Sequence, residues 1–256
     1  KSAGISSQYA VSGVKRLLSV KAGHCGTLDP LATGVLPICV GKATRLAEYV
    51  VGQPKRYLAE ICLGVETDSY DAAGEVLFER EAAQISAEML HALLPKYIGD
   101  IMQTPPLISA LKRDGEPLYR RARRGEQIEL EPRPVKIYSL RLLEFIPGRR
   151  PLVRLEIDCG QGAYIRSLAH DLGRDLGVGA HIRALRRLAV GAFRIEDSYG
   201  LERLAGLMAA GSREFLIPMA RALAHIPALT AGDADLARLL HGNDAPITGQ
   251  SLSAEI

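Results

Sequence analysis

The sequence predicts an α+β fold, because segments typical of strands are interspersed with segments typical of amphipathic helices. The clearest strand covers residues 152–159, where apolar and charged residues alternate. Residues 8–19 and 164–176 place apolar side chains at helical spacing. With 47% hydrophobic residues in 256, the chain can form a packed core, either in one large domain or in one domain plus a fragment.

The first hundred residues alternate short elements with turns. We expect helices over residues 8–19, 42–51 and 86–98, and strands over residues 36–40 and 57–63. Ser7 is a suitable cap for the first helix, and Pro95 should bend or end the third. The acidic residues 66–81, which contain glycines, are typical of an exposed turn and edge.

A strand over residues 152–159 presents its charged side chains on one face and is followed by Gly160 and Gly162 and then by a helix. A strand, a glycine turn and a helix also suggest a dinucleotide-binding unit. That interpretation is disfavoured, because GQGAYIRS lacks the third glycine of the motif and no βαβ pattern supports it.

The stretch Gly23 to Gly34, GHCGTLDPLATG, has the composition of a tight loop with a fixed shape. Pro30 disfavours the helical region for Asp29 and pushes it toward an extended conformation. A carboxylate held in this way could accept hydrogen bonds, bind a metal or attack a substrate. The alternative is that Asp29 only closes an Asx turn beside Pro30.

Composition excludes some classes of protein. The formal net charge is only +3, so total charge does not indicate a polyanion partner. No apolar run is long enough to span a membrane, and no signal peptide is visible. The four cysteines form no C-x-x-C pair, which argues against a zinc site or a disulfide framework. We therefore expect a protein of the reducing cytoplasm.

Residues 102–134 are rich in proline and in basic side chains. The basic residues are Lys112, Arg113, Arg120, Arg121, Arg123 and Arg124. They form either the solvated face of a long insertion or a lobe that contacts phosphates, where lysine and arginine release counterions and give salt-dependent affinity.

GHCGTLDPLATGVLPICVGKATRL resembles the signature of the TruB family, the bacterial tRNA pseudouridine synthases. The family usually has threonine at the position of Cys25. The resemblance continues through KRYLAEICLGVETDSYDAAGEV, SALKRDGEPLYRRARRG, GAYIRSLAHDLG and GAHIRALRRLAVG, from residue 1 to about residue 225. At the start, KSAGISS has Ser2 where the family has proline, and we expect both ends to be incomplete.

The resemblance implies a mixed, largely antiparallel central sheet flanked by helices, the pseudouridine synthase fold. It implies a catalytic domain over residues 1–225, with an RNA-contacting insertion over residues 102–134. In that insertion Lys112, Arg120, Arg123 and Arg124 are the candidate contacts to the RNA backbone. Residues 226–256 resemble the start of a PUA domain that is cut short.

The resemblance also assigns roles in catalysis. Asp29 matches the catalytic aspartate, and Arg166 matches the arginine that pairs with it, since a nearby opposite charge favours the ionised carboxylate. Without the resemblance, Arg166 reads as a surface arginine on the first turn of a helix. Cys25 could suggest a thiol nucleophile, but no Cys-His-Asn spacing supports that, so we expect a small loop residue.

Four further residues are implied to bind the substrate base. Tyr57 would stack on the extruded uracil, and Tyr164 would lie against the base and help proton movement. Leu185 matches a leucine that packs on the base, and His24 matches a histidine that helps extrude it. The alternatives are half-buried core tyrosines and a structural histidine.

The resemblance therefore implies an enzyme that isomerises uridine 55 in the T arm of tRNA. Making pseudouridine involves no redox change and no phosphate loss, so we expect no cofactor and no metal. We expect a monomer whose partner is the tRNA T stem-loop. The alternatives are a guide-RNA-dependent synthase subunit and a non-catalytic RNA-binding or folding factor.

Overall fold

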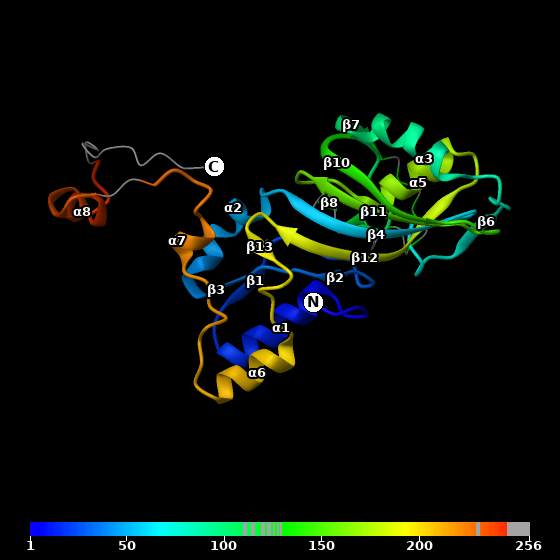
Figure 1. The fold of residues 1–256 in the computed structure, drawn as a ribbon. Helices are drawn as coiled ribbons and strands as arrows, with labels where there is room; N and C mark the ends of the chain where they lie inside the picture. Colours follow the sequence, from blue (N-terminus) through cyan, green and yellow to red (C-terminus); the bar gives the residue numbers. More distant parts are fainter. Residues whose placement is uncertain are drawn as a thin grey trace. The chain divides into compact units, whose positions relative to one another are not determined.

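A seven-stranded sheet lies at the centre of residues 1–212 (Figure 1). Its order is β13-β12-β4-β11-β10-β7 with antiparallel neighbours, and β2 pairs in parallel with β12. The strands are β2 (Thr33–Gly34), β4 (Lys55–Leu63), β7 (Gly99–Gln103), β10 (Arg133–Ile146), β11 (Leu152–Cys159), β12 (Ala180–Val190) and β13 (Phe193–Arg194). The prediction of an α+β fold with a mixed, largely antiparallel sheet is confirmed.

The structure is a computed structural model that forms two compact units, residues 1–212 and residues 213–256. It describes residues 1–109, 112–113, 116–118, 121, 124, 126, 128, 130–228 and 231–244. In its described part, the second unit contains two short helices, α7 (Met219–Ala222) and α8 (Asp233–Leu240). In the described ranges, no helix has the length and apolar character needed to cross a membrane. The predicted domain boundary near residue 225 and the PUA-like segment stay predictions.

Helices and short strands surround the sheet. Among the described residues of this unit, the helices are α1 (Ser7–Leu18), α2 (Ala47–Val51), α3 (Ala87–Leu93), α5 (Ile165–Asp175) and α6 (Leu201–Ala209), with 3₁₀ turns η1 (Gly41–Leu46) and η2 (Leu94–Tyr97). Three two-stranded ribbons pair β1 (Ala22–His24) with β3 (Ile38–Val40), β5 (Val65–Thr67) with β6 (Val76–Glu79), and β8 (Lys112–Arg113) with β9 (Glu116–Pro117). Helices α1 and α6 lie side by side (Figure 1). A Cβ at Gly13 would lie only 3.0 Å from the Leu201 side chain, so the absence of a side chain at Gly13 lets the two helices approach closely.

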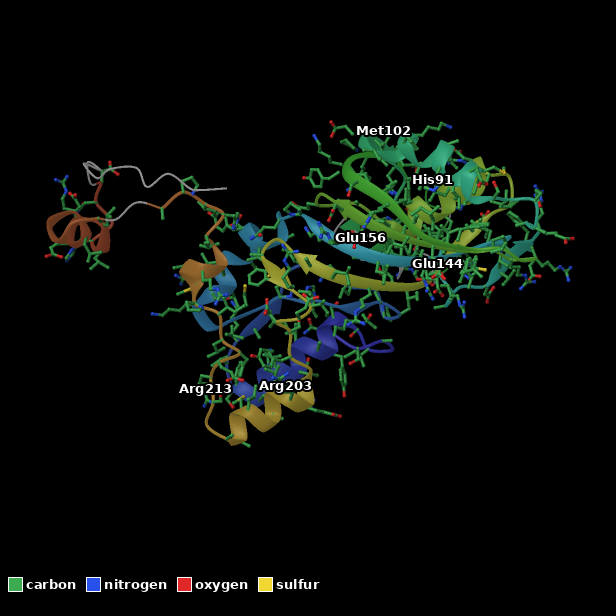
Figure 2. The ribbon with its side chains drawn as sticks, in the orientation of Figure 1. His91, Met102, Glu144, Glu156, Arg203 and Arg213 are labelled. Atoms are coloured by element: carbon green, nitrogen blue, oxygen red, sulfur yellow. The ribbon has the colours of Figure 1, made fainter. Side chains whose placement is uncertain are left out.

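The two faces of the sheet differ in chemistry. Helix α5 packs on β12 and β4, and its buried Leu168 and Leu172 complete an apolar core with the inward residues of the strands. The other face carries ion pairs between neighbouring strands, such as Arg141 with Glu156 and Arg154 with Glu144. Of these residues, Glu144 and Glu156 are labelled in Figure 2. The predicted alternation along residues 152–159 is confirmed, because every second side chain is buried against the core and those between them lie on the other face.

Two local predictions need correction. Ser7 does not cap α1, because Ser6 is the N-cap and its hydroxyl accepts from the backbone N–H of Tyr9. Ser7 is the first residue of the helix, and its hydroxyl forms hydrogen bonds with the backbone of Leu28. The helix expected over residues 42–51 is a 3₁₀ turn followed by a short α-helix, and within it only Val50 is buried.

Strand β12 has an irregular burial pattern. Its burial follows the alternation of a strand only in part, because the register with β4 shifts between Ile182 and Ala184 and again between Arg187 and Ala189. These bulges leave Leu185 and Arg187 buried while the neighbouring Arg186 is exposed. One strand therefore supplies both an apolar and a cationic side chain to the interior.

Candidate active site

The loop between β1 and β2 has a fixed shape. At Gly34 the backbone φ is +112°, and an added Cβ would lie 2.1 Å from the carbonyl oxygen of Arg187, so only glycine fits beside β12. The Ser7 hydroxyl donates to the carbonyl oxygen of Leu28 at 3.0 Å and accepts from its N–H at 2.9 Å. Asp29, the next residue, is therefore attached to helix α1 on one side and to the sheet on the other.

Asp29 forms a two-pronged ion pair with Arg166, the second residue of α5 and 137 positions away. The arginine donates from Nε to Oδ2 at 2.9 Å and from Nη2 to Oδ1 at 3.0 Å. The turn from Asp29 to Ala32 is closed by a backbone hydrogen bond, in which the Ala32 N–H donates to the Asp29 carbonyl oxygen. The carboxylate is thus aimed at a side chain of another element, which the Asx-turn alternative does not explain.

Arg166 is a buried positioning group, since only 4% of its side chain is exposed against 31% for Asp29. Its other donors reach the carbonyl oxygens of Ser69 at 2.8 Å and Ile108 at 3.0 Å. The carboxylate of Asp71, 8% exposed, lies 3.7 Å from Nε. The alternative of a surface arginine is therefore wrong, and the guanidinium is held from several sides.

The Asp29–Arg166 pair opens onto a cavity of about 310 Å³. Its wall is built from the glycine loop, strands β4 and β12, and the turn that leads into α5. The side chains that line it include Asp29, Lys55, Tyr57, Tyr164, Arg166, Leu185 and Arg187. Five of the six residues for which we predict a role in catalysis or base binding therefore meet around one cavity.

The two tyrosines enter the cavity from different elements. Tyr57 lies on the inward face of β4, is 9% exposed and also packs in the core. Tyr164 is the N-cap of α5, and its backbone is fixed by Gln103, which accepts from its N–H at 2.7 Å and donates to its carbonyl at 2.9 Å. Burial raises the pKa of both phenols, so both stay protonated at neutral pH.

Leu185 and His24 have different places. Leu185 is 6% exposed, pairs with Ala59 of β4 and lines the cavity. His24 ends β1 and is absent from the lining of the cavity in the described part of the chain. Burial, with the charge of Arg187, lowers the pKa of His24, so its ring is neutral at pH 7. Its role in extruding the base stays a prediction.

The basic insertion is only partly described. Arg124 is half exposed and pairs with both Glu116 and Glu126. Lys112 lies in β8, and its side chain is outside the described part. Arg120 and Arg123 lie outside the described residues altogether. The contact of these residues with an RNA backbone stays a prediction.

Three residues of the site are absent from the sequence-based predictions. Lys55 is 7% exposed and shares the inward face of β4 with Tyr57, two positions on, so strand alternation could have indicated it. Arg187 is 1% exposed but directly follows the exposed Arg186 and lies close to the exposed Arg183 in the sequence. Asp71 lies in an acidic segment that resembles a solvated turn, and no sequence signal distinguishes it.

The cysteines are all free thiols. The Sγ atoms of Cys25 and Cys39 lie 3.3 Å apart across the β1–β3 ribbon. A hydrogen bond from Cys25 lowers the pKa of Cys39 to about 7, and the same bond, with burial, raises the pKa of Cys25. In the described ranges, no group of three or more His, Cys, Asp or Glu residues is arranged to hold a metal ion.

Comparison with known families identifies the class of this fold and site. A family model described as TruB family pseudouridylate synthase (N terminal domain) matches residues 15–165. A second, described as tRNA pseudouridylate synthase B C-terminal domain, matches residues 166–224. The two matches define a pseudouridylate synthase, an enzyme of the isomerase class. The chain belongs to the TruB family.

Individual relatives agree over most of the chain. The tRNA pseudouridine synthase B of Symbiobacterium thermophilum is 47% identical over 243 residues, which cover 94% of this chain and 80% of that protein. The protein of the same name from Xanthomonas campestris pv. campestris is 48% identical over 240 residues, 93% of this chain and 77% of the relative.

Solved structures confirm the fold. The archaeal box H/ACA sRNP Nop10–Cbf5 complex matches with a TM-score of 0.71 at 29% identity, over 95% of this chain. A Cbf5–Nop10–Gar1 complex matches with a TM-score of 0.74 at 32% identity, also over 95% of this chain. In both cases the chain spans 66% of the length of the matched chain.

Proposed function

We propose that this chain converts uridine 55 in the T arm of tRNA to pseudouridine. The observation that carries the proposal is Asp29, fixed by Arg166 at a cavity whose wall includes Tyr57 and Leu185. The relatives from Symbiobacterium and Xanthomonas bear the name tRNA pseudouridine synthase B, which supports tRNA as the substrate. The T arm and position 55 come from the sequence resemblance.

The target base has to leave the helical stack before Asp29 can reach its sugar. In the proposed mechanism the flipped uracil stacks on Tyr57 and packs on Leu185, a sequence-tolerant contact worth about 1–3 kcal/mol per base. Arg166 keeps Asp29 oriented in the cavity with both oxygens hydrogen-bonded. Asp29 then assists cleavage of the bond between N1 and C1′, the base turns, and C5 rejoins C1′.

The reaction is an isomerisation, so the atoms of substrate and product balance without an oxidant, a reductant or a phosphate donor. We therefore propose that no cofactor takes part. The further predictions that the chain acts as a monomer in the cytoplasm rest on the resemblance.

The decisive experiment incubates the purified chain with a T-arm stem-loop RNA and measures pseudouridine in the product. Replacing Asp29→Asn removes the carboxylate but keeps the shape of the side chain. We expect the rate of product formation to fall at least about a thousandfold, because a residue that acts directly on the reacting atoms is lost. Binding of the RNA should stay nearly unchanged. Product formation at the wild-type rate by the variant would remove Asp29 from the mechanism.

A second candidate function is supported by the likeness to Cbf5, which is solved in H/ACA complexes with Nop10. Under that alternative the chain is a subunit that depends on a guide RNA. The same stem-loop assay distinguishes the two, because turnover on free RNA without partner proteins supports the first. Binding without turnover under all conditions would favour a non-catalytic RNA-binding or folding factor.

A further inference from the structure

The cavity around Asp29 holds more positive charge than its ion pair needs. Its lining contains three cations, Lys55, Arg166 and Arg187, and a single carboxylate, Asp29. The charge of Arg166 is neutralised by its ion pair with Asp29, and the carboxylate of Asp71 also lies within 3.7 Å of its Nε atom. Lys55 and Arg187 are left without a carboxylate partner among the described residues.

Both of these cations are buried, and each donates hydrogen bonds to backbone carbonyl oxygens. Arg187, 1% exposed, donates from Nε to Val35 at 2.8 Å and from Nη2 to Gly26 at 3.0 Å, with a longer contact from Nη1 to Thr27. Lys55, 7% exposed, donates to the carbonyl oxygen of Val51. Arg187 thereby holds both sides of the glycine loop, whereas Lys55 has further donors available toward the cavity.

A buried, unneutralised cation is costly, because the protein interior replaces water poorly around a charge. Burial and the nearby charge of Arg187 lower the pKa of Lys55, which reflects this cost. The groups around the amine are Arg187, Tyr57 and the thiol of Cys159, whose own pKa burial raises to about 12. None of these three groups supplies a negative charge at neutral pH, so the Lys55 amine has no anionic partner among the described residues.

The proposed reaction supplies one. When the bond between N1 and C1′ breaks, its electron pair stays on the base, and the electron deficiency at C1′ is met by Asp29. The base carries negative charge until C5 bonds to C1′, after which C5 loses its proton and N1 gains one. Fixed positive charge at the place where negative charge develops stabilises the transition state more than the ground state.

We propose that Lys55, supported by the positioning residue Arg187, is a further catalytic residue that stabilises the anionic uracil formed when the glycosidic bond breaks. The inference rests on the proposed function and deepens it. Lys55 and Tyr57 lie two residues apart on the inward face of β4, so a base stacked on Tyr57 is within the same cavity wall as the amine.

The test compares Lys55→Met and Lys55→Gln with wild type in single-turnover assays on the T-arm stem-loop. Methionine keeps the length of the side chain and removes the charge, and glutamine keeps a hydrogen-bond donor. We expect the rate of both variants to fall tenfold or more. The midpoint of thermal unfolding should be unchanged or higher, because a buried unpaired charge has been removed. Lys96→Met, on an exposed lysine, is the matched control and should behave as wild type.

A substrate with 5-fluorouridine at the target position tests whether Lys55 stabilises negative charge on the base. Because its C5 carries fluorine and has no proton to lose, the rate measured on this RNA is the consumption of the target nucleoside and not the formation of pseudouridine. Fluorine stabilises negative charge on the base, so the loss caused by Lys55→Met should be smaller on this RNA than on the uridine RNA. An equal loss on both substrates would overturn the proposal.

The competing source of negative charge is a phosphate of the flipped nucleotide. RNA affinity is therefore compared between Asp29→Asn and the double variant Asp29→Asn, Lys55→Met. Equal affinities support an interaction of Lys55 with the base. A clear loss of affinity in the double variant would indicate that Lys55 binds a phosphate and would overturn the proposal. If wild type makes no pseudouridine, the proposed function fails; if wild type is active and Lys55→Met equals it, only this inference fails.

Discussion

The cavity and the basic insertion both contain arginine and lysine, but they use them differently. Around Asp29 the cations are buried and fixed by carbonyl oxygens or by one carboxylate, as Arg166 and Arg187 show. In the insertion, Arg124 is half exposed and shared between two glutamates. Buried cations interact strongly and in one geometry, whereas exposed cations are screened by water and salt. We therefore expect the first set to control rate and the second to contribute to affinity.

The largest effect among these cations should come from Arg166→Lys. Lysine keeps the charge but cannot donate two parallel hydrogen bonds to Asp29 while also reaching Ser69 and Ile108. We expect the single-turnover rate to fall roughly a hundredfold, since a small displacement of the reacting group is costly. The free energy of unfolding should fall by about 1–3 kcal/mol, measured by urea denaturation. Arg174→Lys, on an exposed arginine of the same helix, is the control. Equal rates for the two variants would contradict the buried-cation interpretation.

A smaller effect is expected from Asp71→Asn, which removes the second carboxylate near Arg166. The Asp71 Oδ1 atom accepts from the Ser69 hydroxyl at 2.7 Å and from the Ala73 N–H at 3.0 Å, and asparagine can keep both contacts. Only the charge 3.7 Å from Arg166 is lost. We expect the rate to fall about tenfold with little change in RNA affinity. Asp68→Asn in the same turn, whose carboxylate accepts from the Glu75 N–H, should leave the rate unchanged.

Arg124→Ala tests the other half of the comparison. An exposed arginine that contacts a phosphate releases counterions, so its loss should weaken tRNA binding a few-fold and reduce the slope of log affinity against log salt by about one. The rate at saturating enzyme should stay at the wild-type value. The effect is limited because Arg124 has to leave Glu116 and Glu126 before it can bind RNA. An unchanged salt slope would remove this residue from the RNA-binding surface.

The comparison also shows where sequence reasoning succeeds. The alternation of apolar and charged residues was sufficient to predict the strand over residues 152–159, because one of its faces is apolar and the other is charged. The ion pair of Asp29 with Arg166 could be expected only from the family resemblance, since no local pattern links positions 137 residues apart. Arg187 could not be separated from its arginine neighbours, because its burial depends on a bulge in β12 that tertiary pairing with β4 creates. The roles of the insertion residues depend on a bound RNA and stay predictions.

The smallest expected effect concerns Cys39, beside the loop rather than in the cavity. The Cys25 thiol donates toward the Cys39 sulfur, which stabilises the thiolate and lowers the pKa of Cys39 to about 7. A thiolate reacts with iodoacetamide and a thiol does not, so the rate of Cys39 alkylation should rise with pH and be half-maximal near pH 7. Cys159, whose pKa burial raises to about 12, should stay unmodified over the same range. Replacing Cys25→Ala removes the donor, so the midpoint for Cys39 should move upward, toward that of an ordinary cysteine. Peptide mass spectrometry after timed alkylation measures each site separately, and a midpoint that Cys25→Ala leaves in place would mean that another group sets the acidity of Cys39.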